Sequence, residues 1–244
     1  MELDPAKSDY RIVVSGDSIS RGVIYDEARG KYALLEHCYV NLMSGALKGA
    51  VRNIARFGST LTRGAAMLAR EVAGSRPDIV LLEFGGNDCD FNWPEVAKDP
   101  AGEHLPRTDY AQFKRLMAET IAGLRARGIV PVLMTLPPLD AEKYLGWVSR
   151  GGGEARANIL KWLGSVSKLY WWQERYNAAI LTIAEETNTK FIDIRGAFLA
   201  RPDFQKLLCA DGIHPNAAGH RLIAEGIMAY IQPRCPFLLK SPCL

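Results

Sequence analysis

The sequence predicts an α/β fold in which helices cover both faces of a parallel β-sheet, a three-layer α/β/α sandwich. Two runs, residues 78–84 (DIVLLEF) and 130–135 (VPVLMT), are nearly continuous in apolar residues, which is typical of strands buried on both faces. Segments with helical spacing separate such runs along the chain. Because strands and helices alternate, we expect right-handed crossovers and therefore parallel strands.

Five short runs rich in strand-forming residues account for the sheet: residues 11–15, 50–54, 78–84, 130–135 and 190–194. Apolar residues recur at helical spacing in four stripes: Leu61, Ala65, Leu68 and Val72; Tyr110, Phe113, Met117 and Leu124; Trp172, Tyr176, Ala179, Ile180, Ile183 and Ala184; Ile223, Ile227, Tyr230 and Ile231. We expect Pro215 in the first turn of the last helix, where a missing N–H leaves no bond unmade.

Composition and charge exclude several classes of protein. The 244 residues are 48% hydrophobic and 23% charged, with a net charge of +3, as is ordinary for a globular protein. We expect a single domain over residues 1–244. The basic residues are dispersed, which argues against a nucleic-acid partner. No apolar run approaches the ~20 residues of a membrane-spanning helix, so no membrane partner is expected.

The cysteines and the first residues predict a reduced, cytoplasmic protein. Residues 1–10 (MELDPAKSDY) lack the basic and apolar regions of a secretion signal. No Cys-x-x-Cys pair occurs, so neither a zinc site nor a disulfide framework is indicated. The five cysteines are scattered: Cys38, Cys89, Cys209, Cys235 and Cys243. Pairing of Cys235 with Cys243 stays open, as does the oligomeric state.

Four polar or glycine-rich clusters lie after predicted strands or before the last helix. They are residues 16–18 (GDS), 56–60 (RFGST), 85–88 (GGND) and 211–215 (DGIHP). Ligands of an open parallel sheet bind beyond the carboxyl ends of its strands. We therefore expect the four clusters to converge on one edge of the sheet.

Ser18, Asp211 and His214 have the chemistry of a catalytic triad. A serine hydroxyl is a poor nucleophile at neutral pH, so it needs a base within hydrogen-bond reach and the base needs an orienting partner. We expect Ser18 to be the nucleophile and His214 the base. Asp211 lies three residues before His214, and in a tight turn its carboxylate would accept the proton of the other imidazole nitrogen.

Attack on an acyl carbon places negative charge on the carbonyl oxygen, which requires hydrogen-bond donors already in position. Three donors are expected for this oxyanion hole: the N–H of Ser18, the N–H of Gly58 and the side-chain amide of Asn87. A glycine lets the backbone approach a substrate closely, and an asparagine amide donates without carrying a charge.

The segments GDSISRG, FGS, GGND and DGIHP resemble, in this order, the four sequence blocks of the SGNH (GDSL-type) serine hydrolase family. The resemblance runs from the first strand to the last helix. It implies a flavodoxin-like five-stranded sheet, the roles given above for Ser18, Gly58, Asn87, Asp211 and His214, and hydrolysis of esters with no metal and no cofactor.

Three insertions on the carboxyl-end side of the sheet are expected to shape the active-site face. Residues 23–34 (VIYDEARGKYAL) alternate as a β-hairpin does. Residues 88–107 read as a long loop, which in compact domains is usually functional or disordered, and residues 137–170 are the third insertion. Trp93, Trp147 and Trp162 in the second and third insertions are candidates for substrate binding, while Trp172 is expected in the core. The glycines at 151–153 predict either a lid hinge or a flexible surface loop.

Several other polar residues read as structural. We expect Asp17 to bond the backbone of its own loop. Cys89 is expected to be a small buried thiol, and His220 to be exposed or packed on its helix. His37 and His104 have no recognisable partners. Asp88, Asp90 and Asp193 match no spacing of metal ligands.

These observations predict a serine esterase that hydrolyses a small acyl ester, an acetyl ester above all, carried by a carbohydrate or another small molecule. The alternative within the family is a lysophospholipase or acyl-thioesterase. A non-catalytic carbohydrate-binding protein is the alternative from another class. A flavin- or nucleotide-binding protein is disfavoured because residues 16–22 lack the glycine patterns of a phosphate-binding loop.

Overall fold

A parallel five-stranded sheet forms the centre of the protein in the computed structural model, which describes residues 3–150 and 152–240. Its strands are β1 (Arg11–Gly16), β4 (Ala50–Asn53), β5 (Ile79–Glu83), β6 (Val130–Met134) and β7 (Lys190–Ile192). They pair in the order β4-β1-β5-β6-β7, and every pairing is parallel. This is the flavodoxin-like order, so the predicted fold class is confirmed.

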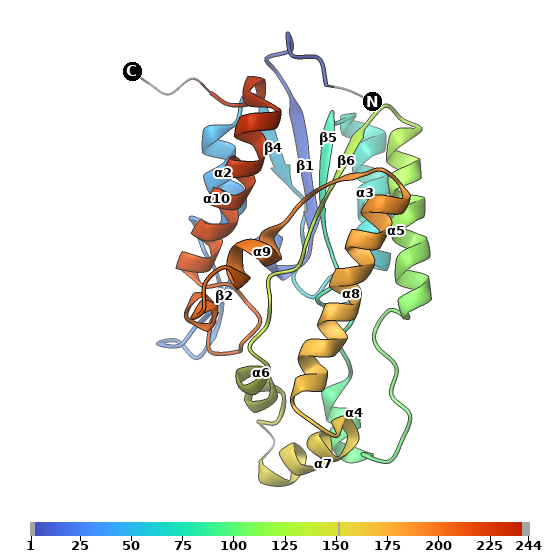
Figure 1. Ribbon diagram of the computed structural model, residues 1–244, viewed down its shortest axis with the longest axis vertical. Coiled ribbons are helices and arrows are strands. Elements are labelled where there is room, and N and C mark those ends of the chain that lie inside the picture. Colours follow the sequence, from blue (N-terminus) through green and yellow to red (C-terminus); the bar gives the residue numbers. More distant parts are fainter. Residues whose placement is uncertain (1–2, 151, 241–244) are drawn as a thin grey trace.

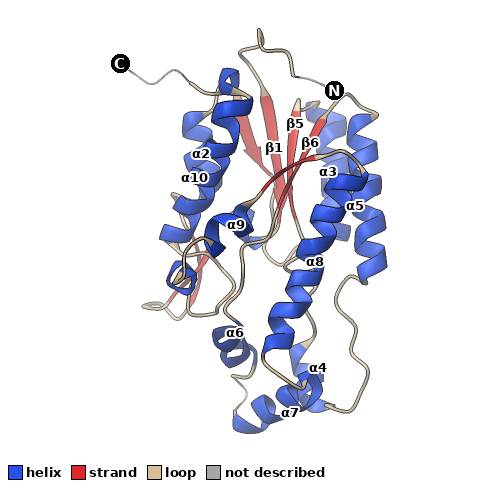
Figure 2. Cartoon of the chain, in the orientation of Figure 1, coloured by secondary structure: helices blue, strands red, loops and turns tan. Residues whose placement is uncertain are grey.

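Helices cover both faces of the sheet, as Figures 1 and 2 show. One face is covered by α2 (Tyr39–Ala46), α9 (Ile194–Leu199) and α10 (Ala217–Arg234), and the other by α3 (Leu61–Ser75), α5 (Tyr110–Arg125) and α8 (Ser167–Glu186). Successive strand residues enter opposite cores: Ile12 and Val14 pack on the first face and Val13 on the second. The nearly continuous apolar runs of the sequence are explained by this burial on both sides.

Side-chain caps set where helices begin. Asp109 accepts hydrogen bonds from the N–H groups of Ala111 and Gln112 at the start of α5. Asn216 caps α10 in the same way, so that helix starts at Ala217. Pro215 therefore lies just outside the helix rather than in its first turn, where we had expected it, and forms an isolated bridge with Leu208.

The first insertion is a β-hairpin, as predicted. Its strands are β2 (Val23–Asp26) and β3 (Lys31–Leu34), which pair antiparallel and apart from the main sheet. It follows the single-turn helix α1 (Ser18–Arg21), which ends at Gly22 with a φ of 81°. A left-handed conformation of this kind favours glycine.

The other two insertions contain helices, although residues 88–107 were predicted to be a long loop. Residues 88–107 contain α4 (Trp93–Lys98), and residues 137–170 contain α6 (Ala141–Val148) and α7 (Gly153–Leu163). These helices lie beyond one end of the sheet, at the lower end of Figure 1. Their apolar residues form a third core with the start of α8. The triple glycine, predicted to be either a lid hinge or a flexible surface loop, includes Gly151, which lies outside the described residues.

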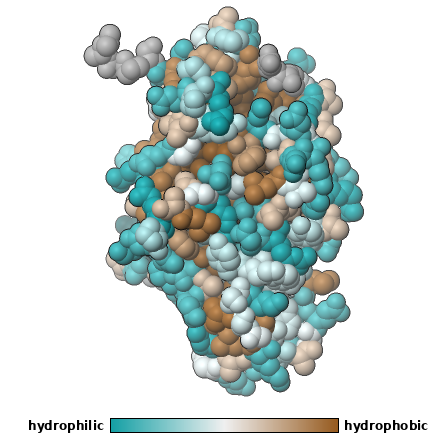
Figure 3. Space-filling view, viewed as in Figure 1, coloured by the Kyte–Doolittle hydropathy of each residue, from teal (hydrophilic) through white to brown (hydrophobic). Residues whose placement is uncertain are grey.

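The molecular surface is mostly hydrophilic on the face drawn in Figure 3, with hydrophobic side chains gathered in smaller patches. Two single-turn 3₁₀ helices, Phe204–Leu207 and Pro236–Leu238, complete the regular structure of the described chain. Among residues 3–150 and 152–240, no helix is both long and apolar enough to cross a bilayer.

Candidate active site

Ser18 lies directly beyond the carboxyl end of β1, at the N-terminus of α1. A Cβ on the preceding Gly16 would lie 2.4 Å from Oγ of Ser20, so only glycine fits this turn. Asp17 caps α1, since its Oδ1 accepts a hydrogen bond from the N–H of Ile19 at 2.9 Å. The expected role of Asp17 toward its own loop is thus confirmed, and the short helix presents the Ser18 hydroxyl at the rim of the sheet.

His214 and Asp211 come from the turn before α10 and meet Ser18 there. Nε2 of His214 is 2.8 Å from Oγ of Ser18, although 196 positions separate the two residues. Nδ1 of His214 is 2.6 Å from Oδ2 of Asp211. The other oxygen, Oδ1, accepts the N–H groups of Ile213 and His214, each at 3.1 Å. The turn therefore holds the imidazole between carboxylate and hydroxyl.

The environment of Asp211 favours its charged form. Burial alone would raise the pKa of Asp211, but the hydrogen bond from His214 and the neighbouring imidazole charge outweigh it, so the pKa is lowered. A carboxylate bonded to Nδ1 fixes the tautomer in which Nε2 is free to accept a proton from the serine. The three side chains thus have the contacts that activation of a hydroxyl requires.

Gly58, Asn87 and Ser18 line the same pocket. Gly58 has a φ of 68°, a left-handed conformation that glycine adopts most readily. Among the described residues, the N–H groups of Ser18 and Gly58 donate to no protein acceptor. Asn87 donates one amide hydrogen from Nδ2 to Oδ2 of Asp17 at 3.0 Å, which leaves the other for a ligand. The expected donors are therefore brought together.

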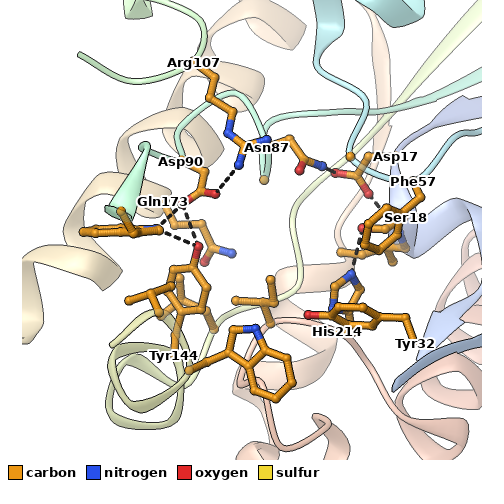
Figure 4. Close-up of a pocket in the computed structure, with 18 residues that line it drawn as sticks. Asp17, Ser18, Tyr32, Phe57, Asn87, Asp90, Arg107, Tyr144, Gln173 and His214 are labelled. Carbon is orange, nitrogen blue, oxygen red and sulfur yellow. Dashed lines mark hydrogen bonds and ion pairs between the residues drawn. The ribbon is translucent and has the colours of Figure 1, made fainter. Parts of the chain in front are cut away.

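The pocket lies where the strand order reverses, because β4 and β5 flank β1 on opposite sides. Open α/β sheets bind ligands at such a point. The pocket has a volume of about 290 Å³. Its lining residues, many of them labelled in Figure 4, are Asp17, Ser18, Ile19, Tyr32, Phe57, Gly58, Gly86, Asn87, Asp90, Trp93, Arg107, Leu139, Tyr144, Trp147, Val148, Gln173, Ile213 and His214.

An aromatic wall surrounds the imidazole. Tyr32 of the hairpin meets His214 edge-on with centroids 5.3 Å apart, and Phe57 stacks on it at 6.2 Å. Trp147 of α6 packs on Tyr32 at 5.9 Å, and the guanidinium of Arg150 covers Trp147. Sequence reasoning missed Tyr32 and Phe57. The position of Phe57 directly before Gly58 was the available signal.

A polar wall faces the triad across the pocket (Figure 4). Oδ1 of Asp90 accepts hydrogen bonds from the Tyr144 hydroxyl at 2.6 Å and from Nε1 of Trp93 at 2.7 Å. Arg107 lies 3.3 Å from Oδ2 of Asp90. Burial raises the pKa of Asp90, although these donors favour its charged form. The wall combines a carboxylate, a half-exposed guanidinium and the amide of Gln173, a residue that sequence reasoning also missed.

The three tryptophan candidates have different positions. Trp147 and Trp93 line the pocket, although the indole N–H of Trp93 is already donated to Asp90. Trp162 is not among the lining residues. It packs edge-on against Phe91 at 4.9 Å, in the third core. The structure therefore does not bring Trp162 to the pocket, because its ring packs against Phe91 and Trp93 in this core.

The residues read as structural have structural contacts. Asp88 accepts from the N–H of Leu61 and the hydroxyl of Thr108, and Asp193 caps α9. Cys89 is buried, as expected. His220 is fully buried against Tyr39 and so is not exposed. No group of three His, Cys, Asp or Glu side chains within residues 3–150 and 152–240 is arranged to hold a metal ion.

Comparison with protein families supplies the identification. The sequence profile described as the GDSL-like lipase/acylhydrolase family matches residues 14–222, a span that contains every candidate triad and oxyanion residue. The chain belongs to this family. The resemblance seen in the four sequence blocks is thereby confirmed, since all four lie within the matched residues.

Individual relatives of this GDSL-like protein are distant. It is 24% identical over 237 residues to an acetylxylan esterase of Geobacillus stearothermophilus, covering 92% of this chain and 94% of that protein. It is 26% identical over 224 residues to the esterase TesA of Pseudomonas aeruginosa, covering 91% of this chain and 88% of TesA. It matches a GDSL esterase/lipase of Arabidopsis thaliana at 23% identity over 66% of this chain, and spans only 56% of that plant protein's length.

Solved structures confirm the fold of the GDSL-like chain. The lipase/acylhydrolase from Enterococcus faecalis superposes with a TM-score of 0.68 at 22% identity, covering 96% of this chain and all of that one. An acetylxylan esterase variant from Geobacillus stearothermophilus superposes with a TM-score of 0.63 at 19% identity, covering 93% of this chain and 96% of that one. Structural similarity at this level of sequence identity establishes the fold. The substrate has to be inferred from the residues of the site.

Proposed function

We propose that this protein hydrolyses small acyl esters through an acyl-enzyme formed on Ser18. One observation carries the proposal: Ser18, His214 and Asp211 are joined by contacts of 2.8 and 2.6 Å in the pocket that also holds unengaged N–H groups. Nucleophile, base, orienting carboxylate and oxyanion donors then occupy one site, as acyl transfer requires.

The reaction follows from these contacts. Oγ of Ser18 attacks the carbonyl carbon while Nε2 of His214 takes its proton, and Asp211 stabilises the imidazolium. The N–H groups of Ser18 and Gly58 and the amide of Asn87 donate to the oxyanion. His214 then protonates the leaving alcohol as the C–O bond breaks. Water attacks the acyl-serine with His214 again as base, which releases the acid and restores the hydroxyl.

The polar wall supports a small and hydrophilic substrate. An acyl chain of many carbons directed at this wall would cover the half-exposed guanidinium of Arg107 without bonding it, which is costly. Hydroxyl groups of a sugar can exchange hydrogen bonds with the side chains of this wall, and aromatic rings such as Trp147 and Tyr32 stack against sugar faces. We therefore propose an acetyl ester, carried on a carbohydrate, as the substrate class. The likeness to an acetylxylan esterase is in keeping with this class.

Two experiments test the proposal. A fluorophosphonate probe should label the folded protein at Ser18, and Ser18→Ala should remove both the labelling and about a thousand- to a million-fold of the turnover of p-nitrophenyl acetate. Ser165→Ala, at an exposed serine far along the sequence, is the control and should behave as the parent protein. A folded parent that is not labelled would instead favour a non-catalytic carbohydrate-binding protein.

The acyl group is tested separately. A series of p-nitrophenyl esters from acetyl to long acyl chains should show highest kcat/KM for acetyl, and acetylated sugars should exceed acyl-thioesters and lysolipids as substrates. A preference for long chains would overturn the acetyl assignment and favour the lysophospholipase or thioesterase alternative, while leaving the triad in place.

A further inference from the structure

Two carboxyl side chains are buried together behind the nucleophile. Glu83 is the last residue of β5 and pairs in register with Gly16 of β1, so it lies beside Asp17. The relative exposures of Glu83 and Asp17 are 0% and 1%. Within residues 3–150 and 152–240, no lysine or arginine forms an ion pair with either group. Two buried carboxylates without a cation repel one another, so one of them is expected to keep its proton.

The contacts of Glu83 identify where that proton lies. Oε2 of Glu83 accepts the Ser20 hydroxyl at 2.7 Å and the N–H groups of Ser20 and Asp17 at 3.3 and 3.4 Å. Its other oxygen, Oε1, is buried and no donor of the described residues reaches it. Glu83 and Asp17 are neighbours, and a hydrogen bond between their carboxyl groups would lower the pKa of Asp17 and raise that of Glu83. A bond between two carboxyl groups requires a proton, and Oε1 of Glu83 is the oxygen free to carry it.

The other contacts of Asp17 connect this pair to the reaction centre. Its Oδ1 accepts from the N–H of Ile19, which holds the turn that carries Ser18. Its Oδ2 accepts from Nδ2 of Asn87, the bond drawn between these two residues in Figure 4. The amide plane of Asn87, and with it the hydrogen that would meet an oxyanion, is therefore oriented by Asp17.

Apart from Asp17, the titratable groups near Glu83 are neutral. The hydroxyl of Tyr39 on α2 lies 2.6 Å from Oγ of Ser20, and burial raises the pKa of that phenol well above its usual value. His220 on α10 stacks on Tyr39, and burial, with a smaller effect of His214, lowers its pKa to about 4. Burial also raises the pKa of Glu83 well above its usual value, to which the charge of Asp17 adds.

We propose that Glu83 acts as a neutral carboxylic acid that donates its proton to Asp17 and thereby positions the Asn87 amide for oxyanion binding. The inference rests on the proposed function, because it assigns Glu83 as a positioning residue for the reaction at Ser18. Glu83 touches no substrate. It acts through Asp17, and the same acid holds the Ser18 turn through the N–H groups of Asp17 and Ser20.

The first test compares two substitutions at Glu83. Glu83→Gln keeps a neutral donor toward Asp17 and an acceptor for Ser20, so kcat should stay within about threefold of the parent. Glu83→Leu keeps the volume but removes both functions, so kcat should fall about a hundredfold with KM nearly unchanged, the pattern of a lost transition-state interaction. Equal losses in the two variants, or full activity of Glu83→Leu, would overturn the proposal.

The second test does not use activity. Infrared spectra at pH 8 should contain the carbonyl band of a protonated buried carboxyl group, and Glu83→Gln should remove it, whereas Glu185→Gln at an exposed position should not. A spectrum with no band lost in Glu83→Gln would show that Glu83 is ionised and would overturn the inference. If Glu83→Leu does not fold, the proposal is still tested by the infrared band and by the kcat of Glu83→Gln. If the parent lacks esterase activity, the proposed function fails, and the band alone reports on the proton.

Discussion

The ring of Tyr32 lies edge-on against the imidazole of His214, with 5.3 Å between the centroids. Tyr32 comes from the hairpin inserted after α1, and its side is also packed by Phe57 at 5.2 Å and by Trp147. The hairpin thus supplies part of the wall that encloses the base, although it shares no strand pairing with the main sheet.

Tyr32→Ala should lower kcat/KM for p-nitrophenyl acetate about tenfold. An aromatic contact of this kind contributes about 0.5–1.5 kcal/mol beyond burial, and the wider pocket would hold a small acyl group less firmly. Steady-state kinetics with acetyl and octanoyl esters measures the effect, and Tyr32→Phe, which keeps the ring, is the matched control. An unchanged rate for Tyr32→Ala would show that the hairpin takes no part in binding.

Asn87→Ala should reduce kcat by about a hundred- to a thousandfold, as the loss of one oxyanion donor does elsewhere. KM should change much less, because the donor meets a full negative charge only in the transition state. Kinetics at saturating and limiting ester separates the two constants. A large rise in KM at constant kcat would assign Asn87 to ground-state binding instead.

Arg107→Gln should lower kcat/KM about tenfold for an acetylated sugar but leave that for p-nitrophenyl acetate nearly unchanged. Arg107 pairs with Asp90 on the polar wall, where it can reach substrate hydroxyls, and a charged hydrogen bond is worth about 1.5–3 kcal/mol when buried and less when half exposed. Arg201→Gln, at an exposed site away from the pocket lining, is the control. Equal losses on both esters would contradict a role in sugar recognition.

His220 should make the fold less stable in weak acid. Its folded-state pKa is about 4, lowered first by burial and then by His214, whereas the unfolded value is about 6.5. The unfolded chain therefore binds the proton first, and stability present above pH 6.5 is lost as the pH falls toward 4. Between pH 7 and 5 the loss is about 2 kcal/mol.

Denaturant unfolding at pH 7 and pH 5 measures this loss, and His220→Phe should reduce the difference between the two pH values by about that amount. The stacking on Tyr39 is kept by the phenyl ring. If the variant and the parent lose equal stability between pH 7 and 5, other groups cause the acid sensitivity.

The sheet could be predicted from the sequence because strands buried on both faces leave a continuous apolar run. The strongest runs became β5 and β6 within one or two residues of their expected ends. The helix α2 was missed, since it is only eight residues long and has no side-chain cap to mark its start. The order of strands also needs contacts between distant segments, which periodicity does not report.

The reacting groups of the candidate site were predicted from the sequence, but its walls only in part: Trp93 and Trp147 were expected there, whereas Tyr32 and Phe57 were not. Ser18, Asp211 and His214 occur in short segments whose chemistry is local and readable. The residues next to Tyr32 in the sequence indicate only a strand. Its contact with the imidazole of His214 depends on where the hairpin lies in the fold. The sequence could not place Trp162 in the third core, because an aromatic side chain in an insertion has the same sequence signal whether it faces a ligand or a local core. The bond between Asn87 and Asp17 joins residues 70 positions apart.

The nucleophile and its base lie 196 positions apart, and this spacing governs when the protein becomes reactive. A nascent chain still attached to the ribosome before residue 214 is synthesised carries Ser18, Gly58 and Asn87 but has no imidazole to deprotonate the hydroxyl. The serine stays chemically inert until the last helix docks. Covalent labelling of Ser18 should therefore report when His214 has docked beside it, and chains that end before residue 214 should not hydrolyse esters.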